Sequence, residues 1–355
     1  MLSSQPIPLC CNNRDTTLDI AKGLLIILVV LGHAIQYSFG TEYTQSREFF
    51  SNIVFKTIYS FHMPLFMLIS GYLFHNSNKK DFKTLMVTKL IAIGIPMISF
   101  IILCNFYTEI RYLRDYDFTG LFLYIIDQVF RGGTMWFLFS LLLNMTVISI
   151  ITRSLRNKKL QYILMLIVFI LTMLIPDTIL LSSHKYMFPF FCIGYFIKER
   201  KIKLYNGTNN KITLIVLTLL SIIAISWFDT NTYIYTTGFC IVNDYMGHLY
   251  LNTKRIVIAL ITSYTFMQYV HILSNQTKSV AHVLIIRLGQ ISLFVYGFNV
   301  FFDTIYTRVL FLLHINWDFN YIIPFLFTIS TIILATSLYN VFDRSKITRM
   351  ILLGK

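Results

Sequence analysis

Long apolar runs are the feature that most constrains what this chain can fold into. About 20 consecutive apolar residues cross the hydrocarbon core of a bilayer as a helix, and such runs recur from residue 20 to residue 342. Of the 355 residues, 56% are hydrophobic and only 13% are charged, whereas a soluble domain carries about a quarter charged residues. The sequence therefore predicts an all-α integral membrane protein, a polytopic bundle of transmembrane helices.

About ten runs are candidate spans by this length criterion. They cover residues 20–39, 55–74, 86–107, 134–152, 160–181, 186–197, 212–228, 256–273, 289–313 and 321–342. The sixth run is short, and a further apolar stretch at 119–131 is too short to span. We expect a cytoplasmic segment over 1–18, a single transmembrane domain over 19–342 and a cytoplasmic tail over 343–355.

The distribution of basic residues predicts the orientation. If the N-terminus is inside and the sides alternate, the inner segments hold most of the 30 Lys and Arg residues and few of the 16 Asp and Glu residues. Because cytoplasmic loops are enriched in Lys and Arg, both termini are predicted to be cytoplasmic. The net charge of +14 then reflects topology and does not indicate nucleic-acid binding. The five cysteines have no metal-ligand or disulfide spacing, and no metal site is predicted.

The first span places ionisable residues at its mouth and deep inside it. Lys22 and His33 are eleven residues apart, about three helical turns, so they share one face and lie roughly 16 Å apart along the axis. Asp19 precedes Lys22 by three residues, near the same stripe. An imidazole within a bilayer is expensive unless it faces the bundle interior or a wet cavity. His33 is therefore a candidate functional residue; the alternative is a packing histidine bonded to a neighbouring group.

The second predicted span has a backbone break and a second histidine. Pro64 removes the helical hydrogen bond to the carbonyl of residue 60, and the pair Ser70–Gly71 permits close backbone approach. His62 lies near the outer end of this span. It either contacts an acceptor substrate or is an ordinary interfacial histidine.

Two later stretches are further candidate ligand contacts. Arg131 and a glycine pair precede Trp136, which either contacts a ligand or anchors the span at the interface. The polar outer segment 229–255, with several tyrosines, either covers a carbohydrate site or is a solvated loop.

Five motifs occur in order along the chain. They comprise Asp19, Lys22 and His33; Met63, Pro64, Phe66, Ser70 and Gly71; Trp136, Phe137 and Leu138; residues 188–195; and Gly289, Ser292, Leu293 and Tyr296. In this order the chain resembles the membrane acyltransferase-3 family, which O-acylates surface glycans, and within it the fucose 4-O-acetyltransferase-like branch. The resemblance covers residues 14–342, nearly the whole chain.

The resemblance implies transfer of an acetyl group from cytoplasmic acetyl-CoA to a hydroxyl of a cell-surface or lipid-linked saccharide. It implies a multi-pass protein of the cell inner (plasma) membrane with no bound cofactor. His33 would act as general base or as a transient acyl carrier. Lys22 would bind CoA phosphates or polarise the thioester carbonyl, and Asp19 would orient Lys22. The other implied contacts are Lys89 and Ser70 for the acyl donor, and His62, Arg131, Trp136, Tyr296 and Asn299 for the acceptor.

Two positions depart from the family pattern. Many members have two arginines entering the third span, where this chain has only Lys89. Members of the related branch often have histidine where this chain has Asn299, and an amide cannot act as a base at neutral pH. His33 is therefore the main candidate base.

Other functions remain compatible with a polytopic chain. A secondary transporter or flippase of a lipid-linked saccharide would use broken helices and midplane polar sites, as at Pro64, although we find no internal repeat. A structural membrane component would not explain a buried His33. Within the enzyme class, succinyl-CoA is the alternative donor.

Overall fold

The computed structural model describes residues 15–39, 43–109, 118–130, 133–177, 179–205, 210–242, 244–276, 279–312 and 322–355. These residues are mostly helical, and no strand occurs among them. The first part of the chain holds α1 (Thr16–Ser38), η1 (Tyr43–Gln45), α2 (Arg47–Ser51), α3 (Ile53–Ser77), α4 (Phe82–Lys89), η2 (Leu90–Gly94), α5 (Ile95–Glu109), α6 (Phe118–Phe130) and α7 (Trp136–Ser154). It continues with α8 (Lys158–Leu174), α9 (Ile179–Glu199), α10 (Lys211–Ser226), η3 (Thr230–Thr232), α11 (Ile234–Thr237), α12 (Tyr245–Ser274), α13 (Val280–Gln290), α14 (Ser292–Leu312), α15 (Ile322–Phe342) and α16 (Lys346–Leu353).

The predicted all-α, multi-span fold is confirmed. Six helices are long and apolar enough to cross a bilayer, namely α1, α3, the continuous helix Phe82–Cys104, α7, α12 and α15. The pair α13 and α14 is apolar as well but bends by 81°. The other predicted spans fall on α8, α9 and α10, which have 17, 21 and 16 residues. The total of about ten spans and the cytoplasmic location of the termini stay predictions.

Two predicted spans begin well before the expected residue, and a third bends at its start. The helix α9 begins at Ile179, ahead of the predicted residue 186, because the polar stretch before 186 is stabilised inside the bundle: Lys185 pairs with Asp177 at 2.7 Å. The helix α12 likewise begins at Tyr245. The ninth predicted span, 289–313, is wrong at its start, since the chain bends after Gln290 and α14 begins at Ser292.

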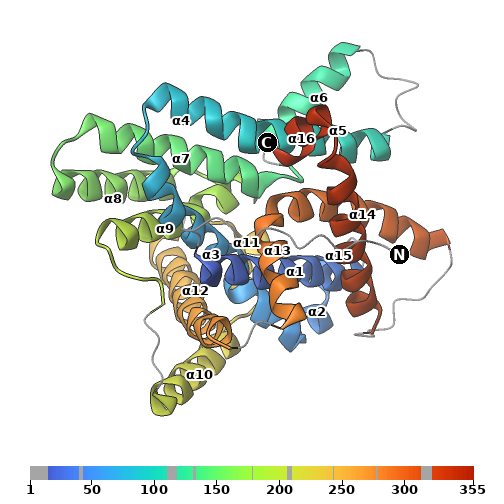
Figure 1. The fold of residues 1–355 in the computed structure, drawn as a ribbon. Helices are drawn as coiled ribbons and strands as arrows, with labels where there is room; N and C mark the ends of the chain where they lie inside the picture. Colours follow the sequence, from blue (N-terminus) through green and yellow to red (C-terminus); the bar gives the residue numbers. More distant parts are fainter. Residues whose placement is uncertain are drawn as a thin grey trace.

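The helix α1 is the centre of the bundle (Figure 1). It packs against α3, α12, α13, α14 and α15, and Leu25, Val30 and Ala34 are fully buried. Its N-terminus is capped by the Asp15 side chain, which accepts hydrogen bonds from the backbone N–H groups of Thr17 and Leu18. The first predicted span is thus the helix around which the others pack.

Glycines bring the motif helices into backbone contact. A Cβ on Gly71 of α3 would lie 2.1 Å from the Phe191 carbonyl oxygen, and one on Gly194 of α9 would lie 1.9 Å from that of Leu68. On the other side of the bundle, a Cβ on Gly289 of α13 would lie 1.8 Å from the Asp19 carbonyl oxygen. Small residues permit such close crossings between membrane helices. These motif glycines therefore set the distances between α3 and α9 and between α1 and α13.

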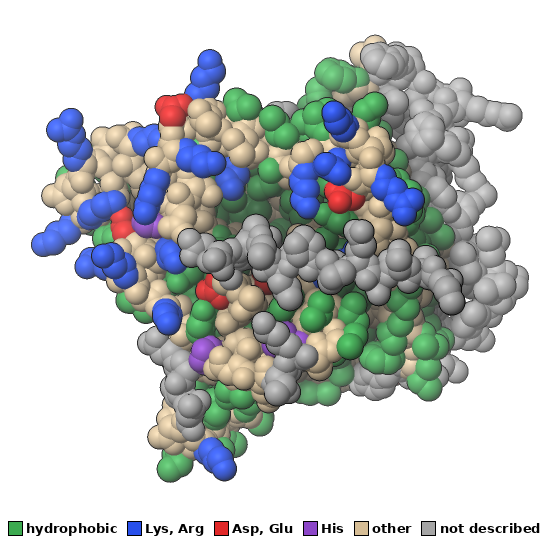
Figure 2. Space-filling model, viewed as in Figure 1, with side chains coloured by type: hydrophobic (Ala, Val, Ile, Leu, Met, Phe, Trp, Pro, Cys, Tyr) green, Lys and Arg blue, Asp and Glu red, His purple; other side chains and the backbone are tan. Residues whose placement is uncertain are grey.

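Basic side chains gather on one face of the molecule. Figure 2 shows Lys and Arg side chains around the ends of α4, α8 and α9 and around α16, with few acidic side chains among them. One of them, Arg153, donates hydrogen bonds to the carbonyls of Asn78 and Lys80, which ties the loop between α3 and α4 to α7. This grouping is the one that the positive-inside rule leads us to expect at a cytoplasmic surface.

Substituting Gly194 with alanine should separate α3 from α9 and destabilise the protein. The added methyl group cannot share the space of the Leu68 carbonyl, and such overpacking costs about 1–3 kcal/mol. We expect a lower thermal midpoint for Gly194→Ala in detergent, measured by differential scanning fluorimetry. Gly94→Ala is the control, because its Cβ would lie 3.5 Å from the nearest atom. Equal midpoints for the two variants would contradict the proposed crossing.

Candidate active site

The larger of two described cavities, here named the His33 chamber, has a volume of about 230 Å³. Residues of α1, α3, α7, α9, α11, α12 and α14 line it. Its polar lining residues include His33, Gln36, Ser60, His62, Thr232 and Arg255, and its aromatic ones include Tyr37, Tyr43, Tyr59, Trp136, Tyr186, Tyr233, Tyr235 and Tyr296. Many of these rings carry a hydroxyl, so the chamber offers both flat apolar faces and hydrogen-bonding groups.

At the wall of the His33 chamber, His33 contacts a buried acid. Its Nδ1 lies 3.2 Å from Oδ2 of Asp303, whose side chain is fully buried. The Asn299 side-chain amide donates a 2.8 Å hydrogen bond to the same oxygen. Asn299 and Asp303 are one turn apart on α14, so this helix presents both groups where it packs against α1. The arrangement orients the imidazole through a carboxylate that is itself held by an amide.

A second histidine, His62 of α3, lines the same chamber. It is 2% exposed, and its Nδ1 donates to the Ile58 carbonyl oxygen at 2.7 Å, since a carbonyl can only accept. The Tyr59 ring packs edge-on against it, and the Tyr59 hydroxyl donates to Gln36 at 2.8 Å. In the neutral imidazole, this leaves Nε2 of His62 as a hydrogen-bond acceptor.

The second cavity, here named the Lys22 chamber, has a volume of about 100 Å³. Lys22, Ser70 and Ser292 supply polar groups to its largely apolar wall. Nζ of Lys22 lies 2.8 Å from Oδ1 of Asp19, and the Lys22 side chain is 18% exposed. The ion pair fixes the ammonium group at one end of α1, at the wall of an apolar cavity.

The two chambers share a wall made by Met63 and Tyr296, which line both. We name these two side chains the septum; they are 8% and 6% exposed. Phe137 of α7 supports the septum from the Lys22 chamber, with its ring centre 5.9 Å from that of Tyr296. Lys22 and His33, on one face of α1, therefore serve two adjacent cavities that a pair of buried side chains divides.

The structure brings most of the predicted site residues to one or other chamber. His33, His62, Trp136 and Tyr296 line the His33 chamber, and Lys22, Ser70 and Tyr296 line the Lys22 chamber. Asp19 forms an ion pair with Lys22.

Two predicted contacts lie elsewhere. Asn299 is fully buried and bonds to Asp303 without lining either chamber. Lys89, at the end of α4, lies 6.0 Å from the centre of the Phe74 ring and lines neither chamber. Arg131 falls outside the described residues. In the part of the chain that the structure describes, no three metal-ligating side chains are grouped to hold a metal ion.

Asp303 is the site residue that motif reasoning missed. It lies in the predicted ninth span, and the signal was available: an acid inside an apolar helix usually marks a functional site. Its four-residue spacing from Asn299 also predicts a shared helix face. Its contact with His33, 270 positions earlier in the chain, depends on how α1 packs against α14. The residues next to Asp303 in the sequence therefore do not predict it.

The comparisons with known proteins decide the family. A family model described as an acyltransferase domain matches residues 15–339. The chain belongs to the membrane acyltransferase-3 family. This acyltransferase is similar to the nodulation protein NolL of Sinorhizobium fredii, with 26% identity over 292 residues, 80% of this chain and 77% of that protein. It is also similar to NolL of Mesorhizobium japonicum, with 31% identity over 233 residues, 64% of this chain and 60% of that protein. No solved structure matches the acyltransferase.

Neutralising Asp303 should impair acyl transfer. Asp303→Asn keeps the shape of the side chain but loses the charge that orients and stabilises the imidazole, so we expect turnover to fall by about 10²-fold or more. Asn299→Ala should have a smaller effect, because His33 keeps its carboxylate partner. The steady-state rate of acyl transfer by purified protein measures both effects.

Asp343→Asn is the control for loss of a carboxylate. Asp343 is half-buried and pairs with Arg349 near the C-terminus, away from both chambers. Wild-type turnover in Asp303→Asn would show that the carboxylate has no part in the reaction.

Proposed function

We propose that this acyltransferase moves an acetyl group from cytoplasmic acetyl-CoA to a hydroxyl of a cell-surface or lipid-linked saccharide. The observation that carries the proposal is the pair of chambers divided by the septum, one with the Lys22 ammonium group and the other with the His33–Asp303 pair. A cation suits an anionic donor, and a paired imidazole suits proton transfer from a hydroxyl.

On the donor side, Lys22 would attract the phosphates of CoA or polarise the thioester carbonyl. Asp19 holds the ammonium group but leaves it partly exposed, so it stays available to a ligand. The largely apolar wall beyond it suits the thioester end of the donor, since a dry site strengthens each remaining electrostatic interaction. Ser70 lines this wall, although its hydroxyl donates to the Phe66 carbonyl, which leaves it an acceptor role.

In the transfer itself, His33 would act as general base. A carboxylate only accepts hydrogen bonds, so with Asp303 ionised the imidazole proton is on Nδ1 and Nε2 keeps its lone pair. Nε2 takes the proton of the acceptor hydroxyl as the oxygen attacks the thioester carbonyl carbon. The C–S bond then breaks, the new ester forms, and the CoA thiolate leaves with the proton from the imidazolium. Asp303 stabilises that imidazolium while it exists.

A second route uses the same residues in two steps. Nε2 attacks the thioester carbonyl carbon first, the C–S bond breaks, and CoA leaves as the thiolate, which would leave an acetyl-imidazolium beside Asp303. The acceptor hydroxyl then attacks the acetyl carbon, the N–C bond breaks, and the hydroxyl proton passes to the freed Nε2 and from there to solvent. In this route the donor and the acceptor need not be in contact, because only the acetyl group passes the septum.

On the acceptor side, the His33 chamber would hold one sugar ring. Aromatic faces pack on the C–H groups of a sugar, and the tyrosine hydroxyls and His62 can bond its hydroxyls. With the termini cytoplasmic and about ten spans in the inner (plasma) membrane, the His33 chamber would be reached from the outer side, since His33 lies past the midplane when Lys22 is interfacial.

Replacing His33 tests the proposed function directly. Purified protein in nanodiscs should release CoA from acetyl-CoA, and His33→Ala should lower the rate by about 10²–10⁴-fold, the usual contribution of a positioned base. His282→Gln is the control, because this buried histidine lines neither chamber. A transporter would bind a saccharide without consuming the thioester. Release of CoA at equal rates with and without His33 would contradict the proposal.

Truncating the septum should uncouple the two chambers. Met63→Ala joins them and admits water to the thioester, so we expect acetyl-CoA hydrolysis without acceptor to rise by about threefold to tenfold, because closed sites suppress such side reactions. Met67→Ala, a fully buried methionine one turn away on α3, makes the same truncation without joining the chambers. If both variants hydrolyse acetyl-CoA at the wild-type rate, the septum does not separate donor from water.

A further inference from the structure

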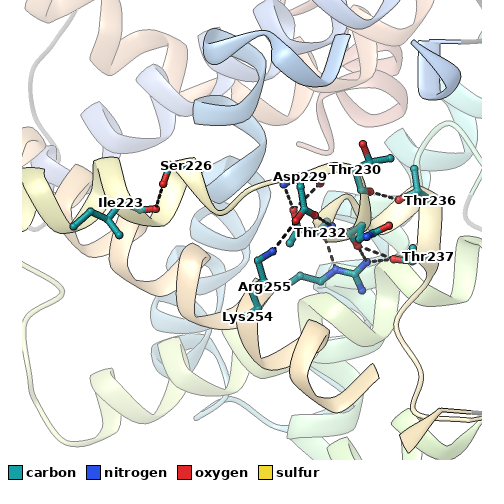
Figure 3. Close-up of polar contacts among 10 residues, drawn as sticks. Ile223, Ser226, Asp229, Thr230, Thr232, Thr236, Thr237, Lys254 and Arg255 are labelled. Carbon is teal, nitrogen blue, oxygen red and sulfur yellow. Dashed lines mark hydrogen bonds and ion pairs between the residues drawn. The ribbon is translucent and has the colours of Figure 1, made fainter. Parts of the chain in front are cut away.

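The segment between α10 and α12 is built around one buried arginine. We name residues 229–239, which include η3 and α11, the Arg255 loop. Arg255 belongs to α12, is 3% exposed, and lies against the turns of this loop (Figure 3). The sequence left open whether the segment covers a carbohydrate site or is a solvated loop.

The guanidinium group of Arg255 bonds the loop backbone along its length. Nε donates a hydrogen bond to the Thr232 carbonyl at 2.9 Å, and Nη1 donates one to the Gly238 carbonyl. Nη2 donates to two carbonyls, those of Asn231 at 2.7 Å and Tyr233 at 3.4 Å. It also donates to the side chains of Asn252 and Thr237. In the described part of the chain, none of these bonds goes to a carboxylate. A planar fork with five N–H donors can hold several carbonyls at once, which a lysine ammonium group cannot do in the same geometry.

Two acids hold the ends of the loop. At its start, Asp229 accepts from the Thr232 backbone N–H at 2.8 Å and pairs with Lys254 at 2.7 Å. At its end, Asp177 accepts from the Phe239 backbone N–H. Gly238 adopts φ +70°, and a Cβ there would lie 2.7 Å from the Asp177 carboxylate. The loop backbone therefore has a defined conformation.

The residues that the Arg255 loop holds in place form one wall of the His33 chamber. Thr232, Tyr233, Ile234 and Tyr235 all line it, as does Arg255 itself. Tyr233 is 2% exposed. Its hydroxyl lies 3.4 Å from that of Tyr43, and its ring centre lies 5.6 Å from that of Tyr59, the ring that packs on His62. The wall therefore adjoins the proposed acceptor-binding His62.

Burying a cation against neutral carbonyls costs free energy. Stability of the loop alone would not require the aromatic rings of the loop to face a cavity. The geometry points to a specificity role: Arg255 is a positioning residue, and the Arg255 loop selects the acceptor sugar through Tyr233 and Tyr235. This inference rests on the proposed function and deepens it. It concerns which hydroxyl compound accepts the acetyl group and leaves the reaction of His33 with the donor unchanged.

The experiment measures how the acetyl group partitions between a sugar and water. Each transfer releases one CoA, and the acetyl group becomes either an ester of a methyl glycoside or free acetate. Wild-type protein is incubated with acetyl-CoA and methyl glycosides of glucose, galactose, mannose and fucose, and the preferred glycoside is used to compare Arg255→Gln, Arg255→Lys and Tyr235→Ala. Arg153→Gln is the matched control, because Arg153 also donates to loop carbonyls but lies away from the His33 chamber.

We expect Arg255→Gln and Tyr235→Ala to lower the ratio of ester to acetate by about tenfold to a hundredfold, since small misplacements of a bound substrate have effects of this size. The loss should fall on the ester and not on acetate, because the base and the donor contacts are intact. Arg255→Lys should recover part of the ratio, and Arg153→Gln should keep the wild-type ratio.

An unchanged ratio in folded Arg255→Gln protein that still shows His33-dependent CoA release would overturn this inference alone. So would a parallel loss of ester and acetate. If the wild type acetylates none of the glycosides above the His33→Ala background, the chamber is not an acceptor site for sugars and the inference is wrong. If the wild type also lacks His33-dependent CoA release, the proposed function fails with it.

Discussion

Burial of the Asp303 carboxylate is the constraint on which the site depends. A buried charge costs several kcal/mol unless its partners compensate. Among the described contacts of this carboxylate are Asn299 from α14 and His33 from α1. The contact between His33 and Asp303 therefore fixes how α14 packs against the central helix α1. It also determines which nitrogen of His33 is free. Tyr296, two turns before Asp303 on α14, takes its place in the septum through the same packing. One polar contact thus links the imidazole, the division between the chambers and the position of a helix.

The close helix crossings at the motif glycines and the septum both favour a site from which water is excluded. Close contact between α3 and α9, and between α1 and α13, leaves little room for water paths between helices. The two chambers remain as small spaces of about 230 and 100 Å³, separated by side chains that can change rotamer. In the proposed function, such a wall would let an acetyl group pass in a short-lived opening while hydrolysis of the donor stays slow.

Sequence reasoning succeeded where a pattern is local and failed where helices must pack. The apolar runs predicted the spanning helices, and the eleven-residue spacing predicted the shared face of Lys22 and His33. The start of α9 was missed because Lys185 looks incompatible with a span until its partner Asp177 is known. Asn299 was expected to contact the acceptor, yet it serves Asp303, because the side of α14 that meets α1 is set by tertiary packing. The Arg255 loop was visible only as a polar segment, since its order comes from a single arginine on the next helix.

In the proposed reaction, the acetyl group passes between two chambers that open to opposite sides of the membrane. Protein reconstituted in sealed vesicles, with acetyl-CoA supplied on one side and a methyl glycoside on the other, separates the two substrates by the bilayer. We expect acetylated glycoside on the acceptor side and free CoA retained on the donor side, in the orientation that exposes Lys22 to acetyl-CoA. Product that forms only when both substrates share one side would contradict it.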